Sequence, residues 1–466
     1  MLLVLTSICG FFLGVIARIL CPSLQFLYFV PAIFLPRKIF ILFFMAFAFG
    51  ILRVDLYESG FPVLPFGQIE FVGQVTEEVD KREAYQNVYF KTEFGKVLVK
   101  TDIFTKISYG DTFLISGELE SPSDEVDFSY KNYLARYGVF GLIKNPKLQL
   151  LKAGPPSFFS YLYNVKTTFQ MRINQLYPEP EAGFVSGLLL GSRRGMSPDV
   201  SDAFKAVGLT HIVAISGYNI SLIILLIFSA FSFLRLKLRI ILSVLLISIF
   251  ILLVGLTAAV VRSAIMGFLT LWALYGGRKS QVYFALLWSM FFMVLFNPYI
   301  LFYDVGFQLS FASTFGLIAF TPILKKYFPK MNESLALTLS AQVLTLPFIA
   351  FSFGRLSLIS PIANLLAVPF VPVSMLLTAL SLILGKIVAL PAIFFLWLIL
   401  ETANLLAQVP FAWVEVKFDS FLFVSSFVVL AQFLLRFYKQ QLVRAFRPAE
   451  FFYKSDRLAF QKREKQ

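Results

Sequence analysis

The chain contains very little cysteine, histidine or charge. Its 466 residues include only two cysteines, Cys9 and Cys21, and one histidine, His211. Two cysteines in or beside the first apolar segment exclude a disulfide framework, and no spacing typical of a Cys-based metal site is present. Charged residues make up 15% of the chain, whereas a water-soluble domain carries about 25%. So few charged residues cannot give this many apolar residues a wet surface, which excludes an ordinary soluble protein.

What the chain has instead is a series of long apolar segments. Hydrophobic residues make up 58% of it, and Ile240–Val261 and Leu358–Gly385 contain no charged residue. Each exceeds the roughly 20 helical residues that cross a bilayer. The first segment, Leu2–Leu20, lacks a basic start and a clear cleavage site, so we expect a retained membrane helix and not a removed signal peptide. The sequence therefore predicts a mostly α polytopic membrane protein, built as a helical transmembrane bundle.

Residues 66–155 differ from the rest because they are polar and alternate in the manner of short strands. β-Branched and aromatic residues recur at strand spacing, and Gly95 and the Gly110-Asp111 pair mark turns. We therefore expect a small β-barrel-like domain outside the bilayer. Between Gly67 and Lys152 it carries 11 basic and 13 acidic residues, which is a poor electrostatic footprint for binding phosphates. The expected strands are Glu70–Val75, Val88–Thr92, Val97–Thr101 and Phe113–Leu119.

Apolar helices flank this β-domain on both sides. Before it, Leu2–Leu20 and Ile39–Val54 are clear membrane helices, and Gln25–Leu35 is a shorter third candidate. After a linking region, nine apolar segments follow, and the last is Phe421–Tyr438. The predicted parts are residues 1–56 (N-terminal transmembrane helices), 66–155 (β-domain), 156–206 (amphipathic and short linking helices), 207–438 (transmembrane core) and 439–466 (basic tail).

The linking region combines three helical patterns. Ser157–Leu176 is amphipathic and is expected on the membrane surface. Gly183, Gly187 and Gly191 recur every four residues, which gives one smooth helix face for close packing in a membrane. Ser197-Pro198 is typical of an N-cap followed by the first helical position, and predicts a further short helix.

Basic residues are distributed unevenly over the loops of the nine-segment part. Alternate loops carry nine, whereas the intervening loops carry only Arg355 and Lys417. Because loops rich in Lys and Arg remain in the cytoplasm, we expect the C-terminal tail in the cytoplasm and the β-domain outside, with the bundle in the cytoplasmic (inner) membrane. The nine basic residues are Arg235, Lys237, Arg239, Arg278, Lys279, Lys325, Lys326, Lys330 and Lys386.

Polar residues inside the apolar segments are the candidate functional residues, because a polar group is costly to place in a bilayer. The densest group contains His211, Ser216, Gly217 and Asn219. Ser216 and Gly217 can break a helix, and a broken helix at membrane depth lines a cavity or is buried in protein. The alternative is that Ser and Asn side chains in this group only hydrogen-bond a neighbouring helix.

Four further polar positions lie deep in the predicted bundle. Arg262 has no acidic residue nearby in sequence, so it must face a water-filled cavity, find a partner on another helix, or extend its head toward the membrane surface. Asp304 and Gln308 are four residues apart and are expected to share a helix face. Asn364 lies between two prolines and marks another interrupted helix.

Glu401, Asn404 and Gln408 form a polar stripe along one predicted helix. Such a stripe fits a channel wall and fits equally well a polar seam between two helices. A carboxylate at Glu401 would repel a polyanion, which argues against close contact with such a ligand at that position.

Several segments resemble motifs of the ComEC-type competence family, in the family's order. HIVAISGYN, from His211 to Asn219, is similar to its HLxAISGxH signature, and TAAVVRSAIMG around Arg262 resembles its S-x-x-R-A-x-x-M stretch. NPYILFYDVGFQLSFAST and LTLPFIAFSFGRLSLISPIANLLAVP look like its third and fourth motifs. GDTFLISGELESP and DFSYKNYLARYGVFG resemble the OB-like domain that precedes the family's channel.

The resemblance implies a membrane channel that passes single-stranded DNA into the cytoplasm during natural transformation. Besides DNA and the lipid bilayer, the implied partners are other competence proteins: a DNA receptor, a separate nuclease and a cytoplasmic motor. Together with the cost of intramembrane polar groups, this makes a set of candidate channel-lining residues. They are His211, Ser216, Gly217, Asn219, Arg262, Gln308 and Asn364.

Two departures from the family pattern qualify what is carried over. The second histidine of the first motif is Asn219 here, which can hydrogen-bond but cannot titrate. Many family members end in a metallo-β-lactamase-like nuclease domain, whose metal site needs several His and Asp ligands. This chain has one histidine and ends in a basic tail, so we expect no metal site, no cofactor and no enzymatic activity.

Two other functions remain open. The same membrane scaffold could transport another anionic or polymeric solute, since a fold does not fix a function. An intramembrane enzyme could use His211 and Ser216. These two residues are five apart, so they share no helix face without a break, and no carboxylate is close in sequence to orient the histidine.

Overall fold

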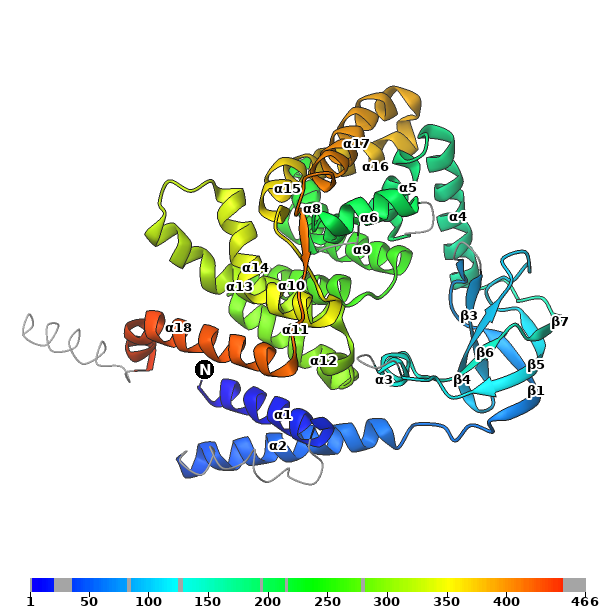
Figure 1. Ribbon diagram of the computed structural model, residues 1–466, viewed down its shortest axis with the longest axis horizontal. Helices are drawn as coiled ribbons and strands as arrows, with labels where there is room; N and C mark the ends of the chain where they lie inside the picture. The colour runs from blue at the N-terminus through cyan, green and yellow to red at the C-terminus, as the bar shows by residue number, and fades with distance from the viewer. Residues whose placement is uncertain are drawn as a thin grey trace, which may run out of the picture.

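The molecule combines a helical bundle with a β-domain at one side of it (Figure 1). The computed structural model describes residues 2–20, 36–81, 85–124, 129–192, 196–213, 217–277 and 281–446. Within these ranges, nine helices are long and apolar enough to cross a membrane, by length and composition. The predicted class, a mostly α polytopic membrane protein with a small β-barrel domain, is confirmed.

The first two helices pack against each other in parallel. They are α1 (Leu2–Leu20) and α2 (Arg37–Glu58). A Cβ atom at Gly14 would lie 2.1 Å from the Phe47 carbonyl oxygen, and one at Gly50 would lie 2.3 Å from that of Phe11. Only glycine allows this close approach of the two backbones. Both predicted helices are present, and the third candidate, Gln25–Leu35, lies outside the described residues.

The β-domain is a closed five-stranded barrel with two added strands. Around the ring the order is β1-β3-β4-β6-β5, and β5 pairs back with β1. The β4–β6 pair is parallel and the other pairs are antiparallel. Strand β2 adds to β3, and β7 adds to β5. The strands are β1 (Gly67–Val75), β2 (Asp80–Lys81), β3 (Gln86–Thr92), β4 (Gly95–Thr101), β5 (Thr112–Glu120), β6 (Val139–Lys144) and β7 (Lys147–Lys152).

This barrel is the expected OB-like domain. Alternate residues of β1 and β3, such as Phe71, Val88 and Phe90, fill its interior. All four expected strands lie within β1, β3, β4 and β5. Strand β6 was not expected, and its burial explains why. Helix α3 (Tyr130–Ala135) covers its outer face, so Val139 and Leu142 are buried outside the barrel core and no alternation shows in the sequence.

The linking region contains three helices, α4 (Phe158–Leu176), α5 (Glu181–Leu190) and α6 (Pro198–Ala206). Ser157 caps α4 in a capping box, and the Ser197 side chain, as predicted, accepts a hydrogen bond from the Val200 amide at the start of α6. The prediction of a smooth helix face made by three glycines is wrong for the last of them, Gly191. Gly191 terminates α5 in a left-handed conformation with φ of 68°, so it does not continue the helix.

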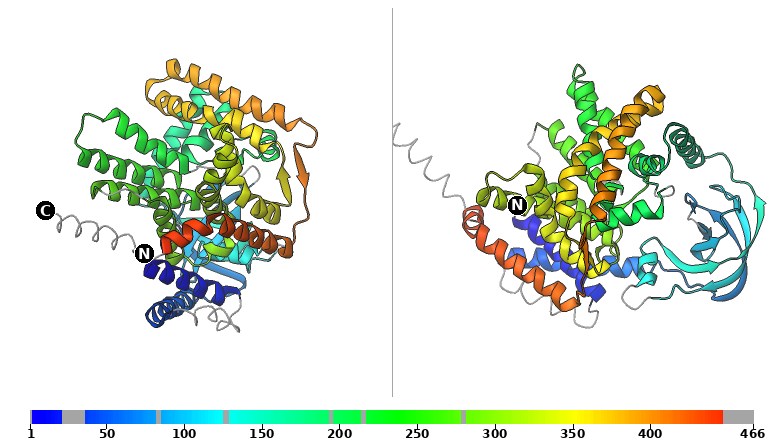
Figure 2. Two further views of the ribbon diagram at one scale, coloured as in Figure 1. Left: turned by 90° about the vertical axis from the view of Figure 1, so that its left-hand side faces the viewer. Right: turned by 45° about the horizontal axis from the view of Figure 1, so that its top comes forward.

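Helix α4 connects the β-domain to the far part of the bundle. Near its middle, Lys166 pairs with Glu78 of the β-domain at 2.7 Å. Just beyond its end, the Tyr177 hydroxyl lies 2.6 Å from the Ser381 hydroxyl in the bundle. The right-hand view of Figure 2 shows the β-domain to one side of the bundle, and in the left-hand view the bundle lies in front of it.

The remaining helices form the transmembrane core. All nine expected apolar segments are helical, although α8 and α11 have only 14 and 15 residues. The core elements are α7 (Thr210–Val213), α8 (Gly217–Ala230), α9 (Leu236–Val254), α10 (Ala258–Tyr275), α11 (Val282–Phe296), α12 (Ile300–Tyr303), α13 (Val305–Tyr327), α14 (Glu333–Phe353), α15 (Ser360–Ala367), η2 (Val368–Phe370), α16 (Val371–Leu384), α17 (Lys386–Ala407) and α18 (Ser420–Phe446).

Helix α10 is central in this core, because it packs against α8, α9, α11 and α13 (Figure 1). A tight turn at Gly255 joins it to α9. The interrupted helix predicted around Asn364 is also present, since the 3₁₀ turn η2 separates α15 from α16. A short antiparallel pair of strands, β8 (Arg355–Ser357) and β9 (Trp413–Glu415), was not expected.

Candidate functional site

The segment between α6 and α8 carries the densest group of predicted site residues. His211 lies on the four-residue helix α7, where its Nδ1 is 3.2 Å from the Gly208 carbonyl oxygen and its side chain is exposed. Helix α7 ends at Val213 and α8 begins at Gly217. Ser216 lies outside the described residues, so the helix break and the pairing of His211 with Ser216 stay predictions.

Gly217 brings the first turn of α8 against α10. A Cβ atom at this position would lie 2.3 Å from Ser263 Oγ and 3.0 Å from Arg262 Nη2. Any larger side chain would therefore force the two helices apart. The glycine thus allows the guanidinium group of Arg262 to lie directly against the start of α8.

Arg262 contacts uncharged groups on α13 and on its own helix, α10. Its Nε donates a hydrogen bond to Ser310 Oγ at 2.7 Å, its Nη1 lies 3.5 Å from the Met266 sulfur, and its Cζ is 5.9 Å from the centre of the Phe311 ring. The residue is 9% exposed. Among the described residues, no carboxylate lies within ion-pair distance of it. Of the three possibilities predicted for Arg262, the structure shows a partner on another helix, Ser310 of α13. This partner is neutral, so it does not neutralise the charge of Arg262.

Asn219 is buried and its amide lacks a partner. It is 3% exposed, and its Nδ2 has no hydrogen-bond partner among the described residues. Residues on a helix are about 100° apart, so Asn219 points about 160° away from Gly217. It shares the side of α8 with Leu222, which packs in the core formed by α5, α15 and α17. Asn219 therefore points away from Arg262, which contacts the opposite side of the first turn of α8.

Asn364 belongs to a second buried polar group. Its Nδ2 donates to the Ser360 carbonyl oxygen at 2.8 Å and lies 3.1 Å from Ser360 Oγ. Gln342 of α14 also donates to Ser360 Oγ, at 2.9 Å. A Cβ atom at Gly208 would lie 2.7 Å from the same oxygen. This group therefore lies beside the residues that precede His211.

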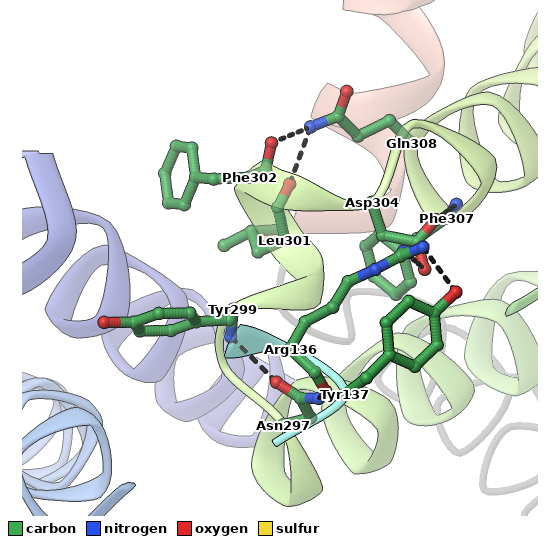
Figure 3. Close-up of polar contacts among 9 residues, drawn as sticks. All are labelled: Arg136, Tyr137, Asn297, Tyr299, Leu301, Phe302, Asp304, Phe307 and Gln308. Carbon is green, nitrogen blue, oxygen red and sulfur yellow. Dashed lines mark hydrogen bonds and ion pairs between the residues drawn. The ribbon is translucent and has the colours of Figure 1, made fainter. Parts of the chain in front are cut away.

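Asp304 lies at the boundary with the β-domain and pairs there with Arg136 (Figure 3). It does not share a helix face with Gln308 as expected, because it is the N-cap of α13 and accepts a hydrogen bond from the Phe307 amide at 2.9 Å. Arg136 follows α3 and lies between the rings of Tyr133 and Tyr137, 4.3 and 4.4 Å from its Cζ. The side chains of the pair are only 7% and 15% exposed.

Gln308 and Asn297 complete this contact (Figure 3). The Gln308 amide nitrogen donates to the carbonyl oxygens of Leu301 and Phe302, at 3.0 and 2.9 Å. The Asn297 amide donates to the Arg136 carbonyl oxygen at 2.7 Å. The polar group of Gln308 thus holds the end of α12, and its role as a lining residue stays a prediction.

Burial and charge shift the pKa values of the groups in this contact. Burial lowers the pKa of Arg136, but the Asp304 carboxylate and the neighbouring tyrosines raise it above its ordinary value. Burial, together with the charge of Tyr133, raises the pKa of Tyr137. Burial beside Glu58 likewise raises the pKa of Tyr299. Arg136 is therefore protonated, and Tyr137 and Tyr299 are neutral, at physiological pH.

The predicted site residues that the structure describes thus do not come together in one place. Arg262 lies with Gly217, Asn364 lies beside Gly208, and Gln308 lies at the boundary with the β-domain. Glu401 and Asn404 are half-buried on α17, and both interpretations of their stripe remain open. Sequence reasoning missed Arg136. The signal was an arginine inside a motif of the β-domain, but nothing in the sequence connects it to Asp304.

No metal site is evident in the part of the chain that the structure describes. No group of three His, Cys, Asp or Glu side chains lies close enough together there to hold an ion. A small pocket between α6 and α7 is lined by Phe204, Lys205, Thr210 and Val213, among others. Its single charged group does not suggest a cofactor.

Comparisons with known proteins point to competence. ComE operon protein 3 of Bacillus subtilis (strain 168) is 28% identical over 295 residues, which cover 61% of this chain and 37% of that protein. Competence protein ComA of Neisseria gonorrhoeae is 30% identical over 220 residues, which cover 44% of this chain and 30% of that protein. The matching part therefore spans 37% of the first relative and 30% of the second. No solved structure matches this chain.

A family model described as "Competence protein" matches residues 188–440. The match covers more than half of the 466 residues and includes α8 to α17, with the Arg262, Asn364 and Asp304 contacts. The resemblance read from the sequence motifs is thereby confirmed: the chain belongs to the competence protein family.

Proposed function

We propose that the chain forms a membrane channel that passes single-stranded DNA into the cytoplasm during natural transformation. Its support is the competence family match together with the many membrane-length helices. The matching part covers 37% of one relative and 30% of the other. DNA as the transported solute therefore belongs to the proposal.

The observation that carries the proposal is the state of Arg262. It lies in the central helix of the family's domain, buried, with no described carboxylate to neutralise it. A cation in such a position needs water, an anion or a counter-charge. A passing phosphate would supply the anion for a moment. One cation, and not a basic cluster, suits a channel because binding must be weak enough for release.

We also propose that the β-domain lies outside and the C-terminal tail in the cytoplasm. Helix α13 starts at Asp304, which contacts the β-domain, and carries Lys325 and Lys326 in its last turn. At about 1.5 Å per residue, its 23 residues cover about the 30 Å of a hydrocarbon core. The basic end is thus about one membrane thickness from the β-domain, and basic loops remain in the cytoplasm.

The chain is proposed to transport DNA and not to cleave it. The sequence has one histidine, whereas a metal-dependent nuclease needs several metal ligands. Other competence proteins, a receptor, a nuclease and a motor, would then supply the remaining steps.

Uptake of labelled DNA tests the main proposal. The gene is deleted in its host, and entry of labelled single-stranded DNA into the cytoplasm is measured with and without the gene restored. We expect uptake to fall to background and to return with the gene. Unchanged uptake would contradict the DNA channel and favour the alternative, a transporter of another anionic or polymeric solute.

Reporter fusions test the orientation separately. A phosphatase that is active only outside the cytoplasm is fused near Ser123 in the β-domain, or after Lys439. The first fusion should be active and the second inactive. The reverse pattern would contradict both the orientation and the inward direction of transport.

A further inference from the structure

The contact between the β-domain and the membrane core is built around one buried ion pair. The Arg136 guanidinium lies between two tyrosine rings and meets the Asp304 carboxylate, and both side chains are largely buried. We refer to Arg136, Asp304 and Asn297 as the joint. Because its members come from two separate parts of the chain, the joint crosses the boundary between two folding units.

Each side of the joint is fixed before the two sides meet. The Asp304 carboxylate accepts a hydrogen bond from the Phe307 amide at the N-terminus of α13, which fixes the position of the carboxylate. The Arg136 side chain is fixed by its tyrosine stack and by a hydrogen bond from its Nη2 to the Tyr137 hydroxyl, at 2.6 Å. Two charges that are held in this way can pair in only one relative orientation.

Neighbouring contacts extend the joint to the first two helices. The Tyr57 hydroxyl of α2 donates to the Ala135 carbonyl oxygen at 3.3 Å, beside the joint. The Tyr299 hydroxyl donates to Glu58 of α2 at 3.0 Å, and Glu58 also pairs with Arg18 of α1 at 3.0 Å. The N-terminal helices, the β-domain and the start of α13 are therefore connected through one set of polar contacts.

A second attachment of the β-domain is made by α4. Lys166 of α4 pairs with Glu78, and the Tyr163 ring of α4 lies 5.3 Å from that of Tyr109. A domain held by one flexible connection is expected to rotate relative to its neighbour. Two separate attachments, at the joint and at α4, prevent that rotation.

We propose that the Arg136–Asp304 joint is a positioning device that holds the β-domain in one orientation on the membrane core, and that DNA uptake depends on this orientation. The second half rests on the proposed function. A buried ion pair is poor evidence for stability, because desolvation offsets the attraction. The Arg136–Asp304 pair instead gives specificity. It allows one docking geometry of the β-domain and disfavours other geometries, in which one of the two charges would be buried without its partner.

Conservative variants separate the ion pair from the other contacts of its members. Asp304→Asn keeps the N-cap, since Asn caps helices as well as Asp, but leaves Arg136 without a counter-charge. Arg136→Gln leaves Asp304 alone in the same way. The double variant leaves neither charge unpaired. As a control, Lys144→Gln with Glu120→Gln removes an ion pair whose side chains are 57% and 42% exposed on the same domain.

The orientation of the β-domain is measured without DNA, from the distance between two spin labels determined by double electron–electron resonance spectroscopy. The labels are placed on Phe104→Cys in the β-domain and Leu256→Cys in the bundle, which are 83% and 77% exposed, with Cys9 and Cys21 replaced by Ser. In lipid nanodiscs, we expect a narrow distance distribution for the parent and the control. Both single variants should give a broad distribution, and the double variant should be narrower than either.

DNA uptake, normalised to inserted protein, is measured for the same variants. We expect each single variant to lose at least about tenfold in uptake, as for a buried charge left without its partner, and the double variant to recover part of the loss. A narrow distribution in both single variants, or a double variant as impaired as the product of the two single losses, would overturn the joint as a positioning device.

The two measurements also separate this inference from the proposed function. Broad distributions with normal uptake would overturn the dependence of transport on orientation. If the parent chain itself supports no DNA uptake, the proposed function fails and the uptake half fails with it. The distance distributions would still test whether the Arg136–Asp304 pair fixes the orientation of the β-domain.

Discussion

Two buried arginines are held in opposite ways in this molecule. Arg136, at the edge of the β-domain, lies between two tyrosine rings and pairs with the Asp304 carboxylate. Arg262, in the middle of the bundle, has the Ser310 hydroxyl, the Met266 sulfur and the Phe311 ring around it. The first charge is neutralised inside the protein, whereas the described surroundings of the second contain only neutral groups.

The difference indicates what each arginine can do. Removing a charge from water costs several kcal/mol, and a counter-charge offsets much of this. A neutralised pair such as Arg136 with Asp304 has little attraction left for a ligand, so its use is to fix a geometry. An arginine without a counter-charge, such as Arg262, retains its attraction for an anion. The comparison therefore assigns position to one arginine and contact with the transported solute to the other.

The largest expected effect is that of Arg262→Leu on transport. A hydrogen bond to a charged group contributes about 1.5–3 kcal/mol, so we expect uptake of labelled DNA to fall about 10- to 100-fold. Leucine favours the membrane, so the amount of inserted protein should stay the same. Arg262→Lys keeps the charge but not the forked donor and should retain part of the activity.

The same variant can also break the comparison. Normal uptake with Leu at position 262 would show that this arginine is not in contact with the solute. Loss of inserted protein would instead show that Arg262 is a packing residue, as Ser310 and Phe311 alone would suggest.

The next effect concerns Asn219, whose Nδ2 is buried without a hydrogen-bond partner among the described residues. If the residue were only structural, Asn219→Leu would remove an unsatisfied polar group and leave the protein equally or more stable. We expect thermal denaturation in detergent to show that Asn219→Leu is at least as stable as the parent. We also expect uptake to fall about tenfold, because one lost hydrogen bond of about 1–1.5 kcal/mol corresponds to that factor. Ser221→Leu, at an exposed position of α8, is the control and should change neither.

Labelling at position 219 makes this test sharper. A cysteine there should react with a water-soluble reagent from at least one side of the membrane if the amide faces an aqueous path. Absence of any reaction, together with normal uptake of Asn219→Leu, would remove Asn219 from the site and leave Arg262 as its centre.

Most of the secondary structure could be predicted from local patterns. Strand alternation identified β1, β3, β4 and β5, and Ser157 and Ser197 marked the starts of α4 and α6, because these signals depend on neighbouring residues only. Strand β6 escaped because α3 buries its outer face, which removes the alternation. That burial depends on tertiary packing, which no local pattern records.

The candidate site could be predicted only in part. Arg262 and Asn219 stood out because polar groups are rare in apolar helices, and the structure buries both. Asp304 was assigned to a helix face although it caps the helix, since a sequence pattern cannot fix a helix end to one residue. Its partner Arg136 lies in another domain, and no property of either local sequence indicates the pairing.

A smaller effect is expected from Gly217→Ala, which adds one methyl group beside Arg262. The new Cβ atom would meet Ser263 Oγ at 2.3 Å, so α8 and α10 must separate. Overpacking of this kind costs about 1–3 kcal/mol, and we expect lower thermal stability with a several-fold loss of uptake. The control is Gly267→Ala on α10, where the nearest atom is 3.4 Å away and an added methyl fits.

This pair of variants sharpens the comparison between the two arginines. If Gly217→Ala weakens uptake while the spin-label distances across the Arg136 joint stay narrow, the two sites act independently. Broadened distances would show that α8 and the joint move together, and the separate roles would have to be abandoned.

The smallest expected effect is none at all, in a test for DNA cleavage by the purified chain. The sequence offers one histidine. In the described ranges, Asp304, the acid of the joint, already pairs with Arg136 and accepts a hydrogen bond from the Phe307 amide. We expect intact single-stranded DNA after incubation with Mg²⁺, Mn²⁺ or Zn²⁺, with or without a chelator. Cleavage that survives repurification, and is lost both with chelator and in Asp304→Asn, would place Asp304 in a metal site. The joint would then be part of a catalytic centre, and the contrast between a positioning arginine and a solute-binding arginine would no longer hold.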